Sequence, residues 1–281
     1  MPILSKIKNL GIVFANKLYV ILPMDVMPLS KAAIDKLLSD MQAVKNKGKA
    51  SAFGHNTATR SGELPGVLED FGIDQLKKGI TSPMQKKVEI ERGKDVYLAR
   101  KTKNMDCGVF LERGGPALLI SIKSPMTSIE KNMGSRFEEA LGDVFTLHEK
   151  YPFCVFGFVY MIPKIDHAKN SKGEKYNRQP NFLKQERFLT TITNRTDTDR
   201  DYMKYEHLAY VVVDWDSTPP KIVDSYPKNK DLSIWQFFDK MIATANERSP
   251  SHPFSELGIH VGGMDAFGRS CNIQIDPKKF A

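Results

Sequence analysis

Two uninterrupted apolar runs constrain the fold of this chain more than any other feature of its sequence. They are Phe153–Ile162 (FCVFGFVYMI) and His207–Trp215 (HLAYVVVDW). Successive positions of a strand point to opposite faces of its sheet, so a continuous apolar run suits a strand that is covered on both faces. We therefore expect both runs to be central strands of a sheet that lies between helices.

Three shorter strand-like runs precede them in the sequence. The first is Lys94–Lys101, the second is Asp106–Glu112 and the third is Ala117–Lys123. The turn signal Arg113–Pro116 (RGGP) separates the second run from the third, and two apolar runs around such a turn predict a β-hairpin.

Three segments have apolar residues at helical spacing, namely Ser30–Lys45, Ser128–Lys150 and Leu232–Arg248, with Ser30 as a plausible N-cap. The order of elements predicts an α/β fold, with a mixed central β-sheet flanked by helices. We divide the 281 residues into an N-terminal helical and loop region (1–61), a core (62–248) and a C-terminal extension (249–281).

Composition excludes several classes of protein. A hydrophobic content of 41% argues against a disordered chain, and no apolar stretch of about 18 residues indicates a membrane span. The three cysteines (Cys107, Cys154 and Cys271) are scattered and form no CxxC pair, which argues against a zinc ribbon and favours a reduced, cytoplasmic setting. The 41 basic residues outnumber the 33 acidic ones, so a polyanionic partner such as nucleic acid is plausible.

A long polar insertion, Lys164–Glu206, separates the two central runs and interleaves basic with aromatic residues. Such an insertion is usually functional or disordered, and this one could supply phosphate and base contacts to DNA. The alternative is a solvated surface segment without that role. The candidate DNA-binding residues within it are Lys175, Arg178, Lys184, Arg187, Arg195 and Arg200.

The residues that indicate chemistry lie on the predicted hairpin and on the helix after it. Asp106 opens one strand, and Lys123 ends the next. Ser121 is two residues before Lys123 and shares its strand face. Glu138 and Glu139 lie fifteen and sixteen residues after Lys123, where the following helix can return over the strand.

A carboxylate, a lysine and a second carboxylate at one point suit metal-assisted hydrolysis of a phosphodiester. Carboxylate oxygens hold Mg²⁺ and leave coordination places for water and phosphate. The metal helps to generate the nucleophile, and a lysine beside the attacking water can orient it or stabilise developing charge.

This arrangement resembles the PD-(D/E)xK nuclease superfamily, to which many Type II restriction endonucleases belong. The family pattern is an Asp followed by (D/E)-x-K on the next strand, and here it reads Met105-Asp106 and Ser121-Ile122-Lys123. Ser121 replaces the second acidic residue, as in the CCGG-cutting branch, where the missing carboxylate moves onto the next helix. The resemblance covers roughly residues 94–215.

The resemblance implies a restriction-endonuclease-like core and a Mg²⁺-dependent enzyme that cleaves double-stranded DNA and leaves 5′-phosphates. Asp106 would hold the metal together with Glu138 or Glu139, with Glu138 favoured because it borders the apolar helix face more closely. Glu63 or Glu69 from the first helical region is a lower-ranked source of that carboxylate. Lys123 would position the water, and Ser121 would lie in the site.

The family further implies a homodimer or tetramer, because cutting both strands needs two active sites, and a bacterial or archaeal cytoplasmic setting. Arg136 on the same helix is a candidate phosphate clamp, and a surface ion pair is its alternative role. Two other functions stay open: a non-cleaving DNA-binding protein on this fold, and an α/β domain that binds an acidic protein or a small phosphorylated ligand.

Overall fold

The computed structural model describes residues 11–14, 17–20, 29–50, 63–111, 115–169, 174–196, 202–248, 263–264 and 270–271. Its centre is a six-stranded mixed sheet with the strand order β12-β11-β8-β7-β6-β3. The strands are β3 (Val88–Glu91), β6 (Cys107–Leu111), β7 (Gly115–Lys123), β8 (Val155–Pro163), β11 (His207–Asp214) and β12 (Lys221–Ile222). The middle strands β7, β8 and β11 are parallel, and the outer pairings are antiparallel.

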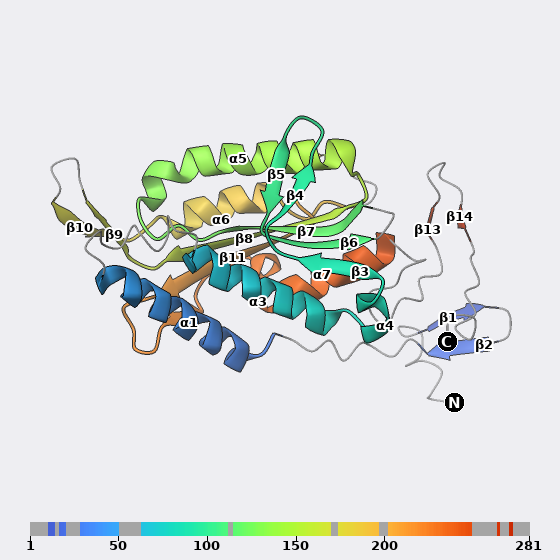
Figure 1. The fold of residues 1–281 in the computed structure, drawn as a ribbon, viewed down its shortest axis with the longest axis horizontal. Helices are drawn as coiled ribbons and strands as arrows, with labels where there is room; N and C mark the ends of the chain where they lie inside the picture. The colour runs from blue at the N-terminus through green and yellow to red at the C-terminus, as the bar shows by residue number, and fades with distance from the viewer. Residues whose placement is uncertain are drawn as a thin grey trace, which may run out of the picture.

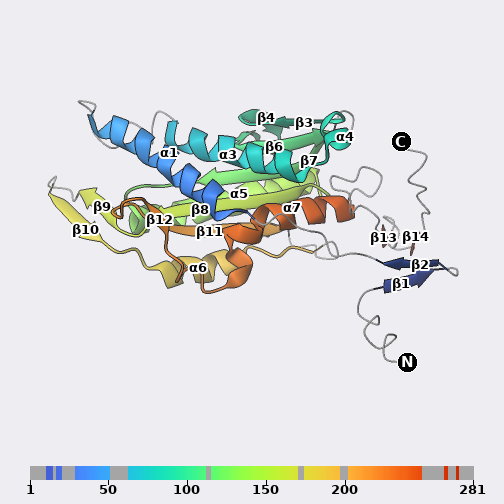
Figure 2. The same ribbon diagram turned by 90° about the horizontal axis from the view of Figure 1, so that it is seen from below.

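Helices cover both faces of this sheet (Figures 1 and 2). One face carries α5 (Ile129–Lys150) and α6 (Phe182–Thr191), and the other carries α1 (Lys31–Ala50), α3 (Glu63–Gly79) and α7 (Ile234–Arg248). The short helices α4 (Ser82–Gln85) and η1 (Lys230–Leu232) precede β3 and α7. The predicted α/β fold with a helix-flanked mixed sheet is confirmed.

The continuous apolar runs divide between two hydrophobic cores. In β8, Val155 and Val159 pack with α1, α3 and α7, whereas Phe156 and Phe158 pack with the α5 side. Adjacent strand residues point to opposite faces, so a strand between two helical layers needs apolar residues at every position. At the start of α1, the hydroxyl of Ser30 accepts a hydrogen bond from the Ala33 amide (3.2 Å), which confirms the predicted N-cap.

The run Lys94–Lys101 does not form a single strand. It contributes β4 (Lys94–Tyr97), and the chain then turns through the Leu98 N–H to Lys101 carbonyl bond (2.8 Å) into β5 (Thr102–Met105). The β4–β5 hairpin forms its own two-stranded sheet and crosses α5 (Figure 1). The expectation of one strand was wrong because a tight turn lies inside the run.

The polar insertion is also only partly a surface segment. Strands β9 (Asp166–Lys169) and β10 (Lys175–Arg178) pair as a two-stranded ribbon, which lies at the same end of the molecule as the C-terminal end of α1 (Figures 1 and 2). In contrast, α6 buries Phe182 and Leu189 in the core on the α5 side. This half of the insertion therefore belongs to the folded core.

Two further antiparallel pairs are described near the chain ends. They are β1 (Gly11–Phe14) with β2 (Lys17–Val20), and β13 (Gly263–Met264) with β14 (Ser270–Cys271). The N-terminal region 1–61, for which the sequence predicts a helix and a loop, contains this first strand pair besides α1. No helix within the described ranges is both long and apolar enough to span a membrane.

Candidate functional site

Asp106 lies between β5 and β6, where the chain leaves the β4–β5 hairpin and enters the central sheet. The β6–β7 register pairs Cys107 with Ile120 and continues to place Asp106 beside Ser121. Asp106 Oδ2 accepts hydrogen bonds from the Ile122 backbone N–H (2.6 Å) and from Ser121 Oγ (3.3 Å). The structure thus brings the predicted aspartate and the Ser-x-Lys segment together.

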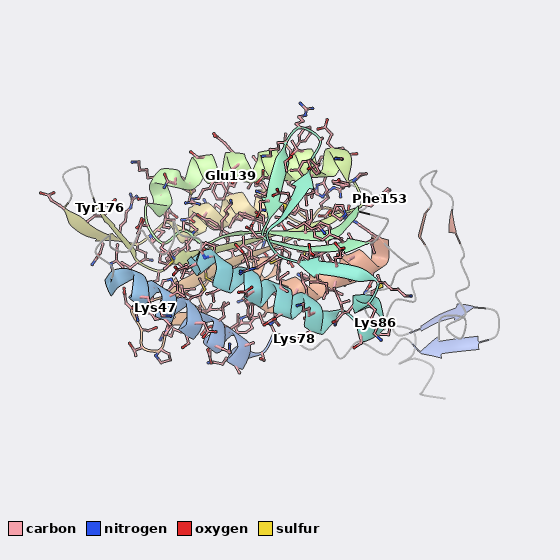
Figure 3. The ribbon with its side chains drawn as sticks, in the orientation of Figure 1. Lys47, Lys78, Lys86, Glu139, Phe153 and Tyr176 are labelled. Carbon is pink, nitrogen blue, oxygen red and sulfur yellow. The ribbon has the colours of Figure 1, made fainter. Side chains whose placement is uncertain are left out.

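Lys123 is the last residue of β7 and is directed towards α5. Its Nζ lies 2.9 Å from Glu139 Oε1 in an ion pair of which both side chains are partly exposed. Figure 3 labels Glu139 on α5, beside the β4–β5 hairpin. Glu138 is exposed and makes no described contact with Asp106 or Lys123. The sequence-based preference for Glu138 is therefore not supported, since the helix turns Glu139 to Lys123.

A third carboxylate reaches the site from α3. Glu69 is partly buried, and its pKa is raised by burial and then by the negative charge of Asp106. Its backbone carbonyl accepts a hydrogen bond from Cys107 Sγ (3.3 Å), which fixes α3 against the start of β6. The sequence offered Glu63 or Glu69 as a lower-ranked source of this carboxylate. The structure brings Glu69 towards Asp106, whereas Glu63 lies exposed at the start of α3.

Burial dominates the electrostatics of Asp106 and raises its pKa above the ordinary value. Four groups oppose this effect, namely the Ile122 N–H, the charges of Lys123 and Lys103, and the Ser121 hydroxyl. Two half-buried carboxylates with raised pKa values in one place are costly while ionised, and a bound cation would remove that cost.

Sequence reasoning missed a second group of charged residues beside the site. Asp143, one helical turn after Glu139, is buried and pairs with both Lys101 and Lys103 from the β4–β5 hairpin. The sequence does indicate Asp143 itself, because it is a charged residue on the apolar side of a predicted helix. Its lysine partners could not be identified, because the chain between them and Asp143 includes two strands and a turn.

The donor set fits a hard cation such as Mg²⁺. No described residue donates a hydrogen bond to Asp106 Oδ1, so this oxygen is free for a cation, and Glu69 and Glu139 offer further carboxylate oxygens. However, the described part of the chain contains no group of three His, Cys, Asp or Glu side chains already gathered for a metal. Glu139 is held instead by Lys123, and a cation would compete with this ion pair.

The predicted DNA-binding residues do not form one surface. Arg178 is exposed on β10, and Lys184 and Arg187 are exposed on α6, where they line an open depression of about 600 Å³. Arg195 is a correction: it is buried, and its Nη1 contacts Glu206 Oε1 (2.7 Å) and the Pro152 carbonyl (3.2 Å), so it cannot reach DNA in this structure. Arg200 and the side chain of Lys175 lie outside the described residues.

Arg136 is partly buried on α5, and its Nε is buried without a hydrogen-bond partner in the described structure. Its positive charge lowers the pKa of Tyr160, although burial of the hydroxyl has the larger and opposite effect and raises that pKa to about 12. Arg136 therefore lies above the sheet, near the β8 residue that is in register with Lys123.

Cys107 and Cys154 are buried free thiols. Burial raises the pKa of both thiols, which makes them poor nucleophiles. No family model, no curated protein and no solved structure matches the chain.

Proposed function

We propose that this protein is a Mg²⁺-dependent endonuclease that hydrolyses phosphodiesters of double-stranded DNA, with a restriction-endonuclease-like core and site-specific cleavage. The observation that carries the proposal is the convergence of Asp106, Ser121 and Lys123 with a glutamate from the next helix. These residues come from the β5–β6 connection, β7 and α5. Three contacts join them: Ile122 N to Asp106 (2.6 Å), Ser121 Oγ to Asp106 (3.3 Å) and Lys123 to Glu139 (2.9 Å). Asp106 is partly buried, and burial of a carboxylate is costly without partners, so this position differs from that of an ordinary surface aspartate.

The roles follow from the contacts. Asp106, Glu139 and Glu69 would hold the metal, which when bound activates water and neutralises charge on the phosphate. Lys123 would leave Glu139 and hold the attacking water or the phosphate oxygen with its ammonium group. Ser121 keeps Asp106 in place by its hydrogen bond (3.3 Å) and contributes no charge. The product would carry a 5′-phosphate, as the family resemblance implies.

DNA binding is assigned to the β9–β10 ribbon and to the exposed basic residues of α6. A two-stranded ribbon has the width that the DNA major groove admits. At the root of the ribbon, the His167 ring lies 2.7 Å from Asn177 Oδ1 and 3.1 Å from the Asp216 carboxylate. Arg178 is exposed on this ribbon and available for phosphate or base contacts. Cleavage of both strands would need a homodimer or tetramer.

The test is cleavage of unmethylated phage DNA with Mg²⁺ or with EDTA, comparing the wild type with Lys123→Ala. Lys86→Ala is the matched control, because Lys86 is an exposed lysine. It lies next to α4, at the end of the molecule opposite to the ribbon (Figure 3). We expect discrete bands that need both Mg²⁺ and Lys123 and that persist in the control.

Other outcomes separate the alternatives. A smear with the same dependence keeps the chemistry and rejects site specificity. Intact DNA together with tight duplex binding that weakens steeply with salt identifies a non-cleaving DNA-binding protein. Neither cleavage nor duplex binding rejects the nucleic-acid proposal and leaves a domain for an acidic protein or a small phosphorylated ligand.

A further inference from the structure

The β4–β5 hairpin is attached along one side of α5 by a series of contacts. The Ala99 N–H donates to the Thr146 carbonyl (3.1 Å), and Lys150 Nζ donates to the Tyr97 carbonyl (2.7 Å). Arg100 forms a bidentate ion pair with Glu149, with both N–O distances at 3.0 Å. These contacts hold the second half of α5 and the turn of the hairpin together.

The contact nearest the candidate site is different in character. Asp143 is 3% exposed, and its two carboxylate oxygens are occupied by different lysines, Oδ1 by Lys101 and Oδ2 by Lys103. Lys103 is 12% exposed, whereas Lys101 is 44% exposed. A buried carboxylate needs a partner, but a single lysine would satisfy its charge. The second, more buried lysine therefore calls for another explanation.

The Lys103–Asp143 pair connects two particular elements, and this connection provides the explanation. Asp143 is one turn after Glu139 on α5, and Lys103 is three residues before Asp106 on the strand that leads into the site. The pair therefore spans the same two elements that carry the candidate metal-binding carboxylates Asp106 and Glu139.

We infer that Lys103 and Asp143 are positioning residues, which fix the separation of the Asp106 and Glu139 carboxylates and thereby set the affinity of the site for its divalent cation. The inference rests on the proposed function and adds two residues that touch neither the substrate nor the metal. Outer residues that orient metal ligands typically change metal affinity by about 10- to 100-fold when they are replaced.

The chain offers a closely matched pair of variants. Lys103→Met and Lys101→Met each remove one lysine from Asp143 and leave the other in place, so the buried carboxylate keeps a partner in both. The two variants lose the same charge from the same hairpin. Lys103 lies within β5, the strand that leads into Asp106, whereas Lys101 lies in the turn before that strand. If the two pairs act only on stability, neither substitution changes the metal requirement of a folded protein.

The experiment measures two quantities on the full chain. They are the Mg²⁺ concentration for half-maximal DNA cleavage and the dissociation constant of Mn²⁺ without DNA, obtained by isothermal titration calorimetry. We expect Lys103→Met to raise both values by about tenfold or more, with Lys101→Met changing them by less than about threefold. Lys103→Arg should restore values near those of the wild type. Glu149→Gln, which breaks the exposed Arg100 pair on the same two elements, should leave both unchanged.

Equal metal requirements of Lys103→Met and Lys101→Met, in an active and folded protein, overturn the inference and leave the proposed function intact. An inactive wild type that does not bind Mn²⁺ rejects the proposed function itself, and the inference with it. Lys103→Gln replaces the methionine variant if thermal denaturation shows that the latter is unfolded. The glutamine keeps a polar group without the charge, so the same comparison applies.

Discussion

Glu138 and Glu139 are neighbours in the sequence and both are exposed, yet of the two it is Glu139 that pairs with Lys123. An α-helix turns about 100° per residue, so adjacent side chains face different surroundings. The apolar pattern of α5 could not choose between them, because both border its buried face. The position of Lys123 at the end of β7 therefore decides which of the two glutamates forms the ion pair.

The proposed site predicts different effects of two similar substitutions. Glu139→Gln should lower the rate of Mg²⁺-dependent DNA cleavage on the order of a hundredfold, because a metal ligand is lost. Glu138→Gln should change it by less than about threefold, because this side chain has no described contact with Asp106 or Lys123. Steady-state cleavage of a plasmid substrate measures both, and similar losses in the two variants would contradict the assignment of Glu139.

A second prediction concerns packing in the centre of the sheet. A Cβ added to Gly157 on β8 would lie 2.7 Å from both Met241 Sδ and Phe237 Cζ of α7. Gly157→Ala should therefore destabilise the protein by about 1–3 kcal/mol through overpacking. Urea unfolding provides the measurement.

Gly142 on α5 is the matched control, because a Cβ there meets no atom within 4 Å. Gly142→Ala should stabilise the protein by about 0.5–1 kcal/mol, since alanine favours the helix. A stabilising effect at both glycines would show that the contact between β8 and α7 is looser than described.

At the scale of elements, α5 depends on a residue that is distant in sequence. Ser128 precedes the helix in a left-handed conformation (φ 56°) and gives no side-chain cap. Instead, the buried Asp166 of β9 accepts hydrogen bonds from the amides of Ser128 (3.0 Å) and Ile129 (2.9 Å). The root of the ribbon therefore fixes the start of the helix that carries Glu139.

Loss of this cap should be measurable. Asp166→Ala should reduce the free energy of unfolding by about 1–2 kcal/mol, because two amides at the N-terminus of α5 lose their acceptor. Asp216→Ala is the control: this nearby carboxylate is exposed and contacts only the partly exposed His167 ring among the described residues, so its loss should cost less than about 1 kcal/mol. Equal midpoints of urea unfolding for Asp166→Ala and the wild type would exclude the capping role.

At the scale of the whole molecule, Glu206 at the start of β11 joins segments that are far apart in the chain. Its Oε1 pairs with Arg195 and with Arg248 of α7, both at 2.7 Å, and its Oε2 accepts the Phe156 amide (2.6 Å). His148 Nε2 from the end of α5 lies 3.3 Å from Oε2. One carboxylate thus connects the ends of both helical layers to the sheet.

This network predicts acid sensitivity. Burial alone would raise the pKa of Glu206, but His148, Arg248 and the Phe156 amide together lower it to about 2 from 4.5. A carboxylate whose pKa is lower in the folded state than in the unfolded state stabilises the fold at every pH above its unfolded-state pKa. This contribution is lost as the pH falls from about 4.5 towards 2. The difference corresponds to about 3 kcal/mol.

Urea unfolding between pH 7 and pH 2.5 measures this loss. Glu206→Gln should be less stable than the wild type at pH 7, because two buried guanidinium groups lose their counter-charge, and the difference should shrink below pH 4.5. Glu138→Gln, which removes an exposed carboxylate, should keep the acid dependence of the wild type. A constant difference between Glu206→Gln and the wild type across this range would contradict the low pKa.

The sequence by itself determined the local elements and the candidate residues. The runs at 153–162 and 207–215 identified the central strands, because only a sheet covered on both faces accommodates such runs. The spacing of apolar residues identified α1, α5 and α7, and the hairpin brought Asp106 next to Ser121. These features follow from interactions between residues near in sequence, or from periodicity.

Only the tertiary structure decided the long-range pairings. It brought Glu69 towards Asp106, chose Glu139 over Glu138, buried Arg195 against Glu206, and joined Lys103 to Asp143. A charged residue looks the same in the sequence whether it is solvated or paired in the interior. Its partner depends on the crossing of whole elements, which the packing of the two hydrophobic cores fixes and local sequence patterns do not record.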